Sequence, residues 1–133
     1  MKTILQVLSL VILSLAWGCG EKKGNQALYD EVMKVHDEVM PKMDNIYKLK
    51  QELKKQISDT ANVGDAKRKT IEATIIKLDS ASEAMMVWMR NFNPLPDSLG
   101  EEKAREYLED QQEKIEKVKQ EMLEAIDKAT KLN

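Results

Sequence analysis

The chain has few of the residues on which disulfides, catalytic triads and metal-bearing helical bundles depend. Its 133 residues include one cysteine, Cys19, and one histidine, His36. A single cysteine excludes a disulfide within the chain, so packing alone must hold the fold together. One histidine without a glycine-rich nucleophile turn gives no catalytic triad, and a di-iron helical bundle uses two histidines. We therefore expect a protein that is not an enzyme and that needs no cofactor.

Aromatic residues, glycines and prolines are also scarce. Aromatics make up 5% of the chain, which has five glycines and three prolines, whereas charged residues make up 33%. This composition is typical of long helices rather than of sheets or disordered tails. The formal net charge is −2, and its interleaved signs form no basic patch of the kind that nucleic-acid-binding surfaces need. We expect an all-α fold and no nucleic-acid partner.

Residues 1–18 form a short hydrophobic leader that ends next to Cys19. Lys2 supplies the positive start, an uncharged apolar stretch covers residues 4–17, and the small residues Ala16 and Gly18 suit a cleavage site. The apolar stretch is shorter than the ~20 residues that a membrane-spanning helix needs. We therefore interpret residues 1–18 as a secretion signal.

The junction Leu15-Ala16-Trp17-Gly18-Cys19 resembles a bacterial lipoprotein signal, although Ala16 stands where such signals usually have a residue like leucine. In lipoproteins the cysteine is lipidated, with palmitate among its acyl chains, and becomes the mature N-terminus. Several chains together hold a protein on a membrane, at ~0.8 kcal/mol per buried methylene. The resemblance implies lipidation of Cys19 and a place in the bacterial cell envelope, facing outside the cytoplasm. The alternative is an ordinary signal that leaves a free thiol.

After a polar spacer at residues 19–26, residues 27–133 predict one helical domain. Apolar residues recur at steps of three and four over residues 27–58, 66–92 and 99–132, which is the spacing of one helix face. Short connections join these segments, so consecutive helices should run antiparallel. We expect an up-down-up three-helix bundle with coiled-coil-like packing. The alternative is an open hairpin that pairs with a second copy as a longer coiled coil.

Local signals set the expected ends of these helices. Pro41 lies inside the first helical segment and has no backbone N–H to donate, so a kink or a break is expected there. Pro94 should end the second helix. Asp65 is expected to cap the start of the second helix, and Ser98 with Glu101 has the spacing of a capping box for the third.

The second helical segment shows the clearest heptad seam, and its expected core residues are Ile71, Ile75, Leu78, Ser82, Met85, Met89 and Phe92. If the first connection is centred near residue 61, residues whose numbers sum to ~122 lie at one level in an antiparallel pair. The expected neighbours are then His36 with Met86, Met33 with Met89, and Met40 with Ser82.

Methionines gather around the histidine in this arrangement. Met33, His36 and Met40 share one face of the first helix, and Met86 and Met89 lie across from them. One interpretation is a Cu(I) site in an extracytoplasmic soft-metal-binding protein, because thioether and imidazole ligands suit this soft ion. A second is core packing, in which methionines fill gaps beside bulky side chains. A third is a sulfur-lined groove that receives a partner helix.

Three stretches together carry a family resemblance: HDEVMPKM at residues 36–43, IYKL at 46–49 and EAMMVWMRNF at 83–92. They are similar to small exported lipoproteins of Bacteroidota that are labelled "viral A-type inclusion protein", a label that describes helical composition rather than an activity. The resemblance implies a lipoprotein with a helical bundle in a bacterial envelope, and it implies no role for any residue. We expect a non-enzymatic, lipid-anchored interaction or structural module with a protein partner yet to be identified. The alternative function is the copper binder.

Overall fold

The structure is a computed structural model that describes residues 24–59, 63–94 and 99–132. The regular structure of these residues consists of four α-helices, α2 (Asn25–Val39), α3 (Lys42–Asp59), α4 (Asp65–Asn91) and α5 (Glu101–Thr130). No strand occurs within these ranges, so the expected all-α fold is confirmed for them. The expected leader at residues 1–18, the lipidation site Cys19 and the spacer up to residue 23 lie outside the described residues.

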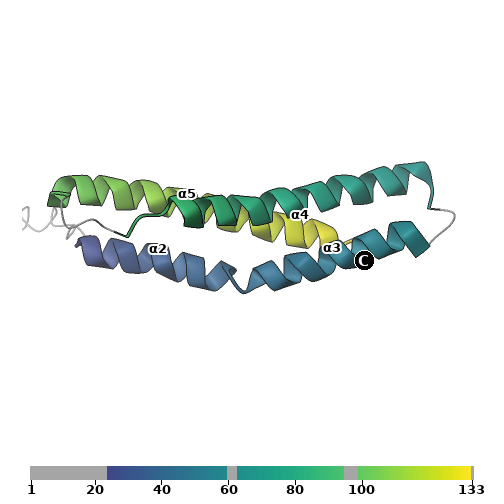
Figure 1. Ribbon diagram of the computed structural model, residues 1–133, viewed down its shortest axis with the longest axis horizontal. Helices are drawn as coiled ribbons and strands as arrows, with labels where there is room; N and C mark the ends of the chain where they lie inside the picture. Colours follow the sequence, from purple (N-terminus) through teal and green to yellow (C-terminus); the bar gives the residue numbers. More distant parts are fainter. Residues whose placement is uncertain (1–23, 60–62, 95–98, 133) are drawn as a thin grey trace, which may run out of the picture.

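The first expected helix is broken at Pro41, which was one of the two predicted outcomes. The backbone N–H of Met40 still donates to the carbonyl of His36 at 2.8 Å, and that of Met43 donates back to Met40 at 3.1 Å. Between them, Pro41 has no N–H and its ring crowds the preceding turn, so the α-helical ladder stops. Figure 1 shows that α2 and α3 nevertheless follow one another as two parts of one long rod.

The predicted caps of the other two helices were wrong. The residues before α4 and α5 are Gly64 and Gly100, and neither helix start has a side-chain capping bond. Asp65 lies inside the first turn of α4, and Glu101 lies inside the first turn of α5. Their charges there interact favourably with the helix dipole, although they do not cap the backbone. Ser98 lies outside the described residues.

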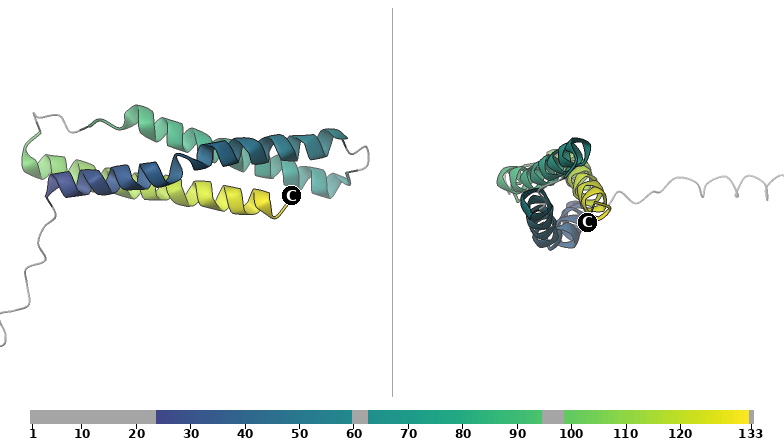
Figure 2. Two further views of the ribbon diagram at one scale, coloured as in Figure 1. Left: turned by 90° about the horizontal axis from the view of Figure 1, so that it is seen from below. Right: turned by 90° about the vertical axis from the view of Figure 1, so that its right-hand side faces the viewer.

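The helices form an elongated bundle in which α5 packs against α2, α3 and α4, and α3 also packs against α4. Figures 1 and 2 show that α4 runs back along the α2–α3 rod and that α5 runs forward again. The start of α2, the end of α4 and the start of α5 therefore lie at one end, which we call the N-terminal end of the bundle. The backbones of α2 and α4 make few direct contacts, so side chains must fill the space between them.

One apolar core runs along the bundle and draws on every described helix. The predicted apolar spacing is confirmed, since the buried side chains recur at steps of three and four. The largest fully buried side chains are Leu53, Ile71, Leu78, Met85, Leu108, Ile115 and Met122. Thr74 is also fully buried, and its hydroxyl donates to the carbonyl of Thr70 at 2.9 Å. This bond satisfies the Thr74 hydroxyl, which would otherwise be costly to bury.

The core face of α4 differs from the predicted heptad seam. Trp88 is only 6% exposed, whereas Met89, which the seam placed inside, is 37% exposed. Thr74 and Ala81 are buried, in place of the predicted Ile75 and Ser82, which are half-buried. The reason is that α4 packs against α3 on one side and α5 on the other, so its buried face points between two partners and not at one.

None of the described helices combines the length and the apolar character that crossing a membrane would require.

Candidate functional site

Aromatic rings fill the space between α2 and α4 near the N-terminal end of the bundle. The ring of His36 on α2 lies 5.8 Å from that of Trp88 on α4, and the ring of Tyr29 lies 6.1 Å from Phe92. Trp88 stacks on Phe92 at 4.8 Å, and Phe92 lies 6.3 Å from Tyr107 of α5. Large flat rings bury much apolar area each, so this aromatic cluster joins α2 to α4 where their backbones make few contacts.

The aromatic contacts also test the prediction of which α4 residue lies beside His36 along the bundle. Its ring packs against Trp88, two residues further along α4 than the predicted neighbour Met86. The contact between Tyr29 and Phe92 at the very end of α4 agrees with the predicted register to within one residue. The expected pairs Met33 with Met89 and Met40 with Ser82 stay predictions, as does any convergence of their side chains.

His36 is held in one orientation by its own helix and by α4. Its Nδ1 lies 2.9 Å from a carboxylate oxygen of Asp37, and its side chain is 16% exposed. Because a carboxylate accepts hydrogen bonds, the arrangement favours the tautomer with the proton on Nδ1 and a free lone pair on Nε2. That nitrogen is therefore the one that could bind a soft metal ion.

Trp88 brings a buried polar group to the same place. Its indole Nε1 is buried and has no hydrogen-bond partner among the described residues. An unpaired buried donor typically costs about 1–3 kcal/mol. The packing of Trp88 between His36 and Phe92 must therefore be worth more than this penalty.

The five candidate metal ligands differ in their surroundings. Met33 and His36 are half-buried on α2, and Met40, directly after the end of α2, is half-buried and packs against the core. Met86 and Met89 on α4 are 38% and 37% exposed. No cluster of three or more His, Cys, Asp or Glu side chains that could hold a metal occurs among residues 24–59, 63–94 and 99–132. Any metal held by these five residues would therefore bind through sulfur and one imidazole, as soft ions do.

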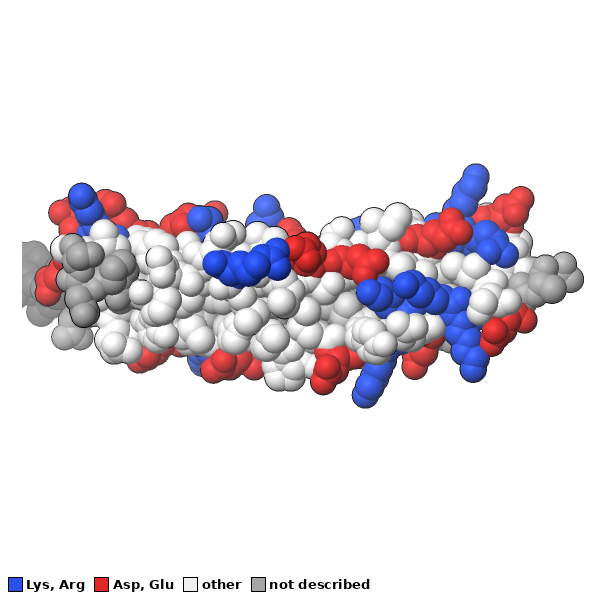
Figure 3. Space-filling view, viewed as in Figure 1, with Lys and Arg blue, Asp and Glu red and all other residues white. Residues whose placement is uncertain are grey.

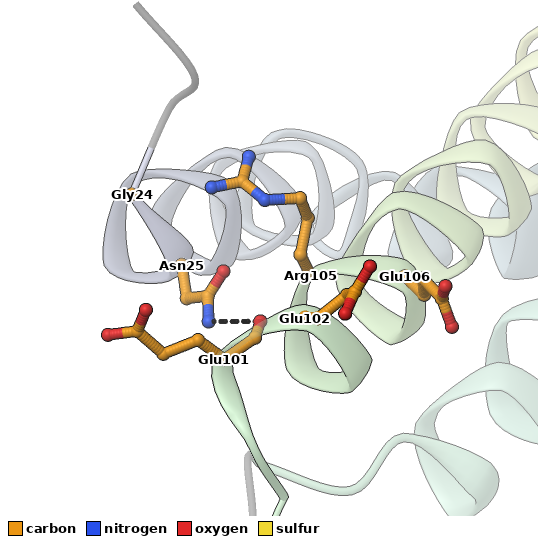
Figure 4. A pocket seen from close by; sticks show the side chains of 6 residues that line it. All are labelled: Gly24, Asn25, Glu101, Glu102, Arg105 and Glu106. Atoms are coloured by element: carbon orange, nitrogen blue, oxygen red, sulfur yellow. Dashed lines mark hydrogen bonds between the residues drawn. The ribbon is translucent and has the colours of Figure 1, made fainter.

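The helix starts at the N-terminal end of the bundle enclose a shallow hollow of about 540 Å³. Figure 4 shows its lining, in which the side-chain amide of Asn25 donates to the backbone carbonyl of Glu101 at 3.0 Å. The other residues that line the hollow are Gly24, Glu102, Arg105 and Glu106. Ligand pockets are usually concave and mostly apolar, whereas this hollow is open and charged.

Two ion pairs join neighbouring helices, one between α2 and α5 and one between α3 and α4. Lys119 of α5 lies 2.8 Å from Glu38 of α2, and Lys50 of α3 lies 2.6 Å from Asp79 of α4. The hydrogen bond from Lys119 lowers the pKa of Glu38, and the same bond raises the pKa of Lys119. The sequence alone did not predict these pairs, because pairs between helices depend on helix rotations that spacing along one helix does not define.

An exposed apolar area on α4 was also missed. Met86, Val87 and Met89 are between 37% and 40% exposed, and they lie within one turn of one another. Figure 3, in the view of Figure 1, shows one face of the bundle whose half nearer the N-terminal end is largely uncharged, although a Lys or Arg side chain crosses it and meets acidic side chains near the middle of the bundle. A heptad seam had placed Met89 inside, so the sequence alone suggested a smaller exposed area.

Comparison with known proteins found no match for the chain among protein-family models, curated proteins or solved structures.

Proposed function

We propose that the chain is a non-enzymatic, lipid-anchored helical bundle of the bacterial cell envelope that acts as an interaction or structural module. The observation that carries this proposal is the kind of surface the bundle offers. The hollow at its N-terminal end is open and lined by charged groups, whereas apolar side chains of α4 are exposed on a convex helix face. Such a face suits contact with another macromolecule better than binding of a small substrate.

The place of the bundle relative to the proposed anchor supports this role. Cys19 precedes Gly24, the first described residue, by five residues, and a chain of that length spans at most ~17 Å. A lipid on Cys19 would therefore keep the N-terminal end of the bundle close to the membrane surface. Nucleic acid is not expected as a partner, because the net charge is slightly negative.

The anchor is tested by substitution of the lipidated residue. Cys19→Ser should move the full chain from the membrane fraction to the soluble fraction, while the matched variant Lys23→Ser, in the expected spacer, should stay with the membrane. Retention of Cys19→Ser in the membrane would contradict the proposal.

The interaction role is tested by crosslinking and recovery from native envelope, with a Met86→Ser, Val87→Ser double variant as the control. Recovery of the same proteins in equal amounts by the unchanged chain and by the double variant would contradict the interaction role.

A second candidate function is binding of Cu(I) outside the cytoplasm, with copper as the bound ion. The observation that favours it is the hydrogen bond between Asp37 and Nδ1 of His36. Metal-binding histidines usually donate a hydrogen bond from the N–H of their other ring nitrogen to a carboxylate or carbonyl in this way. Nε2 of His36 would be one ligand, Met33 and Met40 would be the next, and Met86 or Met89 would complete the set from α4.

This second function has a direct optical test. The chain contains two tryptophans, Trp17 in the proposed signal and Trp88 against His36, so the chain without its signal reports only on Trp88. Titration with Cu(I) under reducing conditions should quench Trp88 fluorescence, and His36→Gln should abolish the quenching at micromolar metal. Met122→Leu, a change at a buried methionine of α5, is the matched control and should leave it intact. Equal quenching in the His36→Gln variant would exclude the site.

A further inference from the structure

The outward face of α4 carries a short apolar area between two opposite charges. Met86 and Val87 are 38% and 40% exposed. Glu83 and Arg90 lie on either side of them along the helix and form an ion pair at 2.6 Å, although both side chains remain more than half exposed. Residues at these steps of three and four share one helix face. This face lies opposite the core face that contains Leu78 and Met85.

The order of these four residues is self-complementary in an antiparallel pair. If two copies of α4 lie antiparallel with a two-fold axis between the levels of Met86 and Val87, Glu83 of each copy stands opposite Arg90 of the other. Met86 then lies on one side of the contact and Val87 on the other. The two-fold axis brings Met86 against Met86 of the second copy, and Val87 against Val87. This is the arrangement that an isologous interface requires, with the same surface used by both subunits.

We infer that a second copy of this chain docks antiparallel on the outward face of α4, centred on Met86 and Val87. The inference names a partner for the proposed interaction role and therefore rests on it. Charge complementarity selects the second copy over other occupants. In the antiparallel pair each Glu83 faces an Arg90 of the other copy, whereas a neutral apolar partner offers no charged group to the exposed Glu83–Arg90 pair. A membrane surface would bring the carboxylate of Glu83 against lipid.

Pairing exchanges ion pairs and does not break them. In the single chain, Arg90 reaches back to Glu83 over about two helical turns, or ~10 Å, and this pair spans the level of Met86 and Val87. In the pair of chains, each Arg90 binds the opposite Glu83, so the number of ion pairs is unchanged. The favourable term is the removal of four apolar side chains from water.

So small a contact predicts weak association in free solution, because stable dimers bury far more surface. A membrane anchor changes this balance, since confinement to one surface raises the effective concentration of the second copy. The position of the contact fits such confinement. The two-fold axis lies ~7 Å from the end of α4 at Asn91, and α2 begins at the same end of the bundle. The N-terminal ends of both bundles therefore lie near the axis, so that lipids on the two copies of Cys19 could enter one membrane.

The test is thiol crosslinking of the full chain in membranes. Met86→Cys and Val87→Cys are each expected to give a crosslinked dimer with a short bismaleimide. The matched control is Leu123→Cys on α5, which is 38% exposed like Met86 and lies outside the proposed contact. The chain with only Cys19 gives the background. A dimer from Leu123→Cys equal to that from Val87→Cys would overturn the inference, as would trapping of a different protein at residue 87.

Charge reversal then separates self-association from chance collision. Glu83→Arg in the Val87→Cys chain should cause loss of the dimer, because two Arg90 and two Arg side chains at position 83 would face each other. Addition of Arg90→Glu should restore it, because the reversed charges again pair across the axis. Unchanged crosslinking in the single reversal would overturn the inference. If no dimer forms while Cys19→Ser still leaves the membrane and another partner is recovered, self-association fails and the proposed interaction role stands.

Discussion

Truncation of Leu78 to alanine is the sharpest test of the packed core. Leu78 lies on α4, is fully buried and belongs to the core cluster that joins α2, α3, α4 and α5. Ile76 lies two residues earlier on the same helix and is 64% exposed. The two side chains have the same number of carbon atoms, so the pair Leu78→Ala and Ile76→Ala removes equal mass from the inside and from the outside of one helix.

The expected loss for Leu78→Ala follows from two terms. Removal of three buried carbon groups at ~0.8 kcal/mol each gives about 2.4 kcal/mol of transfer free energy. The space left behind adds a further term of ~24 cal/mol per Å³ of cavity that does not collapse, which brings the total to about 3–4 kcal/mol. Substitution of the exposed Ile76 should change the free energy of unfolding by no more than ~0.5 kcal/mol.

Urea denaturation followed by circular dichroism at the helical minimum measures both values. Linear extrapolation gives the free energy of unfolding in water, and equal slopes for the two variants would show that they unfold from comparable states. A loss below 0.5 kcal/mol for Leu78→Ala, or an equal loss for Ile76→Ala, would refute the assignment of the core face of α4.

Three further predictions follow from particular contacts. In a carbon NMR titration, Lys119→Gln should raise the lowered pKa of Glu38 towards the ordinary carboxyl value. The control Lys114→Gln, at a lysine that pairs with Asp110, should leave the pKa of Glu38 unchanged. An unchanged pKa of Glu38 in the Lys119→Gln variant would disprove the pairing. The stabilising contribution of Glu38 is present above the ordinary pKa of glutamate and is lost as the pH falls through its lowered pKa, whereas that of Lys119, whose pKa is raised, is lost as the pH rises through that value. Gln111→Leu should leave the free energy of unfolding unchanged or raise it by up to ~1 kcal/mol, because this buried amide bonds only to the neighbouring Asp110 at 3.0 Å; a loss in urea denaturation would show an unrecognised polar role. Gly100→Ser should raise stability by ~0.4–1 kcal/mol, because residue 100 has an ordinary φ of −58° and open space around it; a lower melting temperature would contradict this.

The features that sequence could predict are those with local causes. The break at Pro41 follows from a missing N–H and a bulky ring, which act on the chain's own preceding turn. The end of α4 at Asn91 is similarly explained by Pro94, which restrains the residues before it. The buried spacing of α5, including Leu108, Ile115 and Met122, follows from amphipathic periodicity. In each case the residues within one or two turns contain the whole physical reason.

The features that sequence could not predict depend on how the helices are rotated against one another. Trp88 is buried and Met89 is exposed because α4 lies between α3 and α5, whereas a heptad seam assumes one facing partner. The bond between Lys119 and Glu38 joins residues 81 positions apart, and many lysines and glutamates of this chain would have fitted an equally plausible pairing. The helix starts at Gly64 and Gly100 were missed because exposed N–H groups can bond to water without a capping side chain.

The central claim of this account is that a lipid on Cys19 holds the helical bundle in the bacterial envelope. Intact-mass spectrometry of the chain purified from the membrane fraction of its native host tests it most directly. The account predicts a polypeptide that starts at Cys19, with a mass increase that corresponds to the acyl groups on that residue. A chain that still begins at Met1, or one whose Cys19 carries an unmodified thiol, would contradict it.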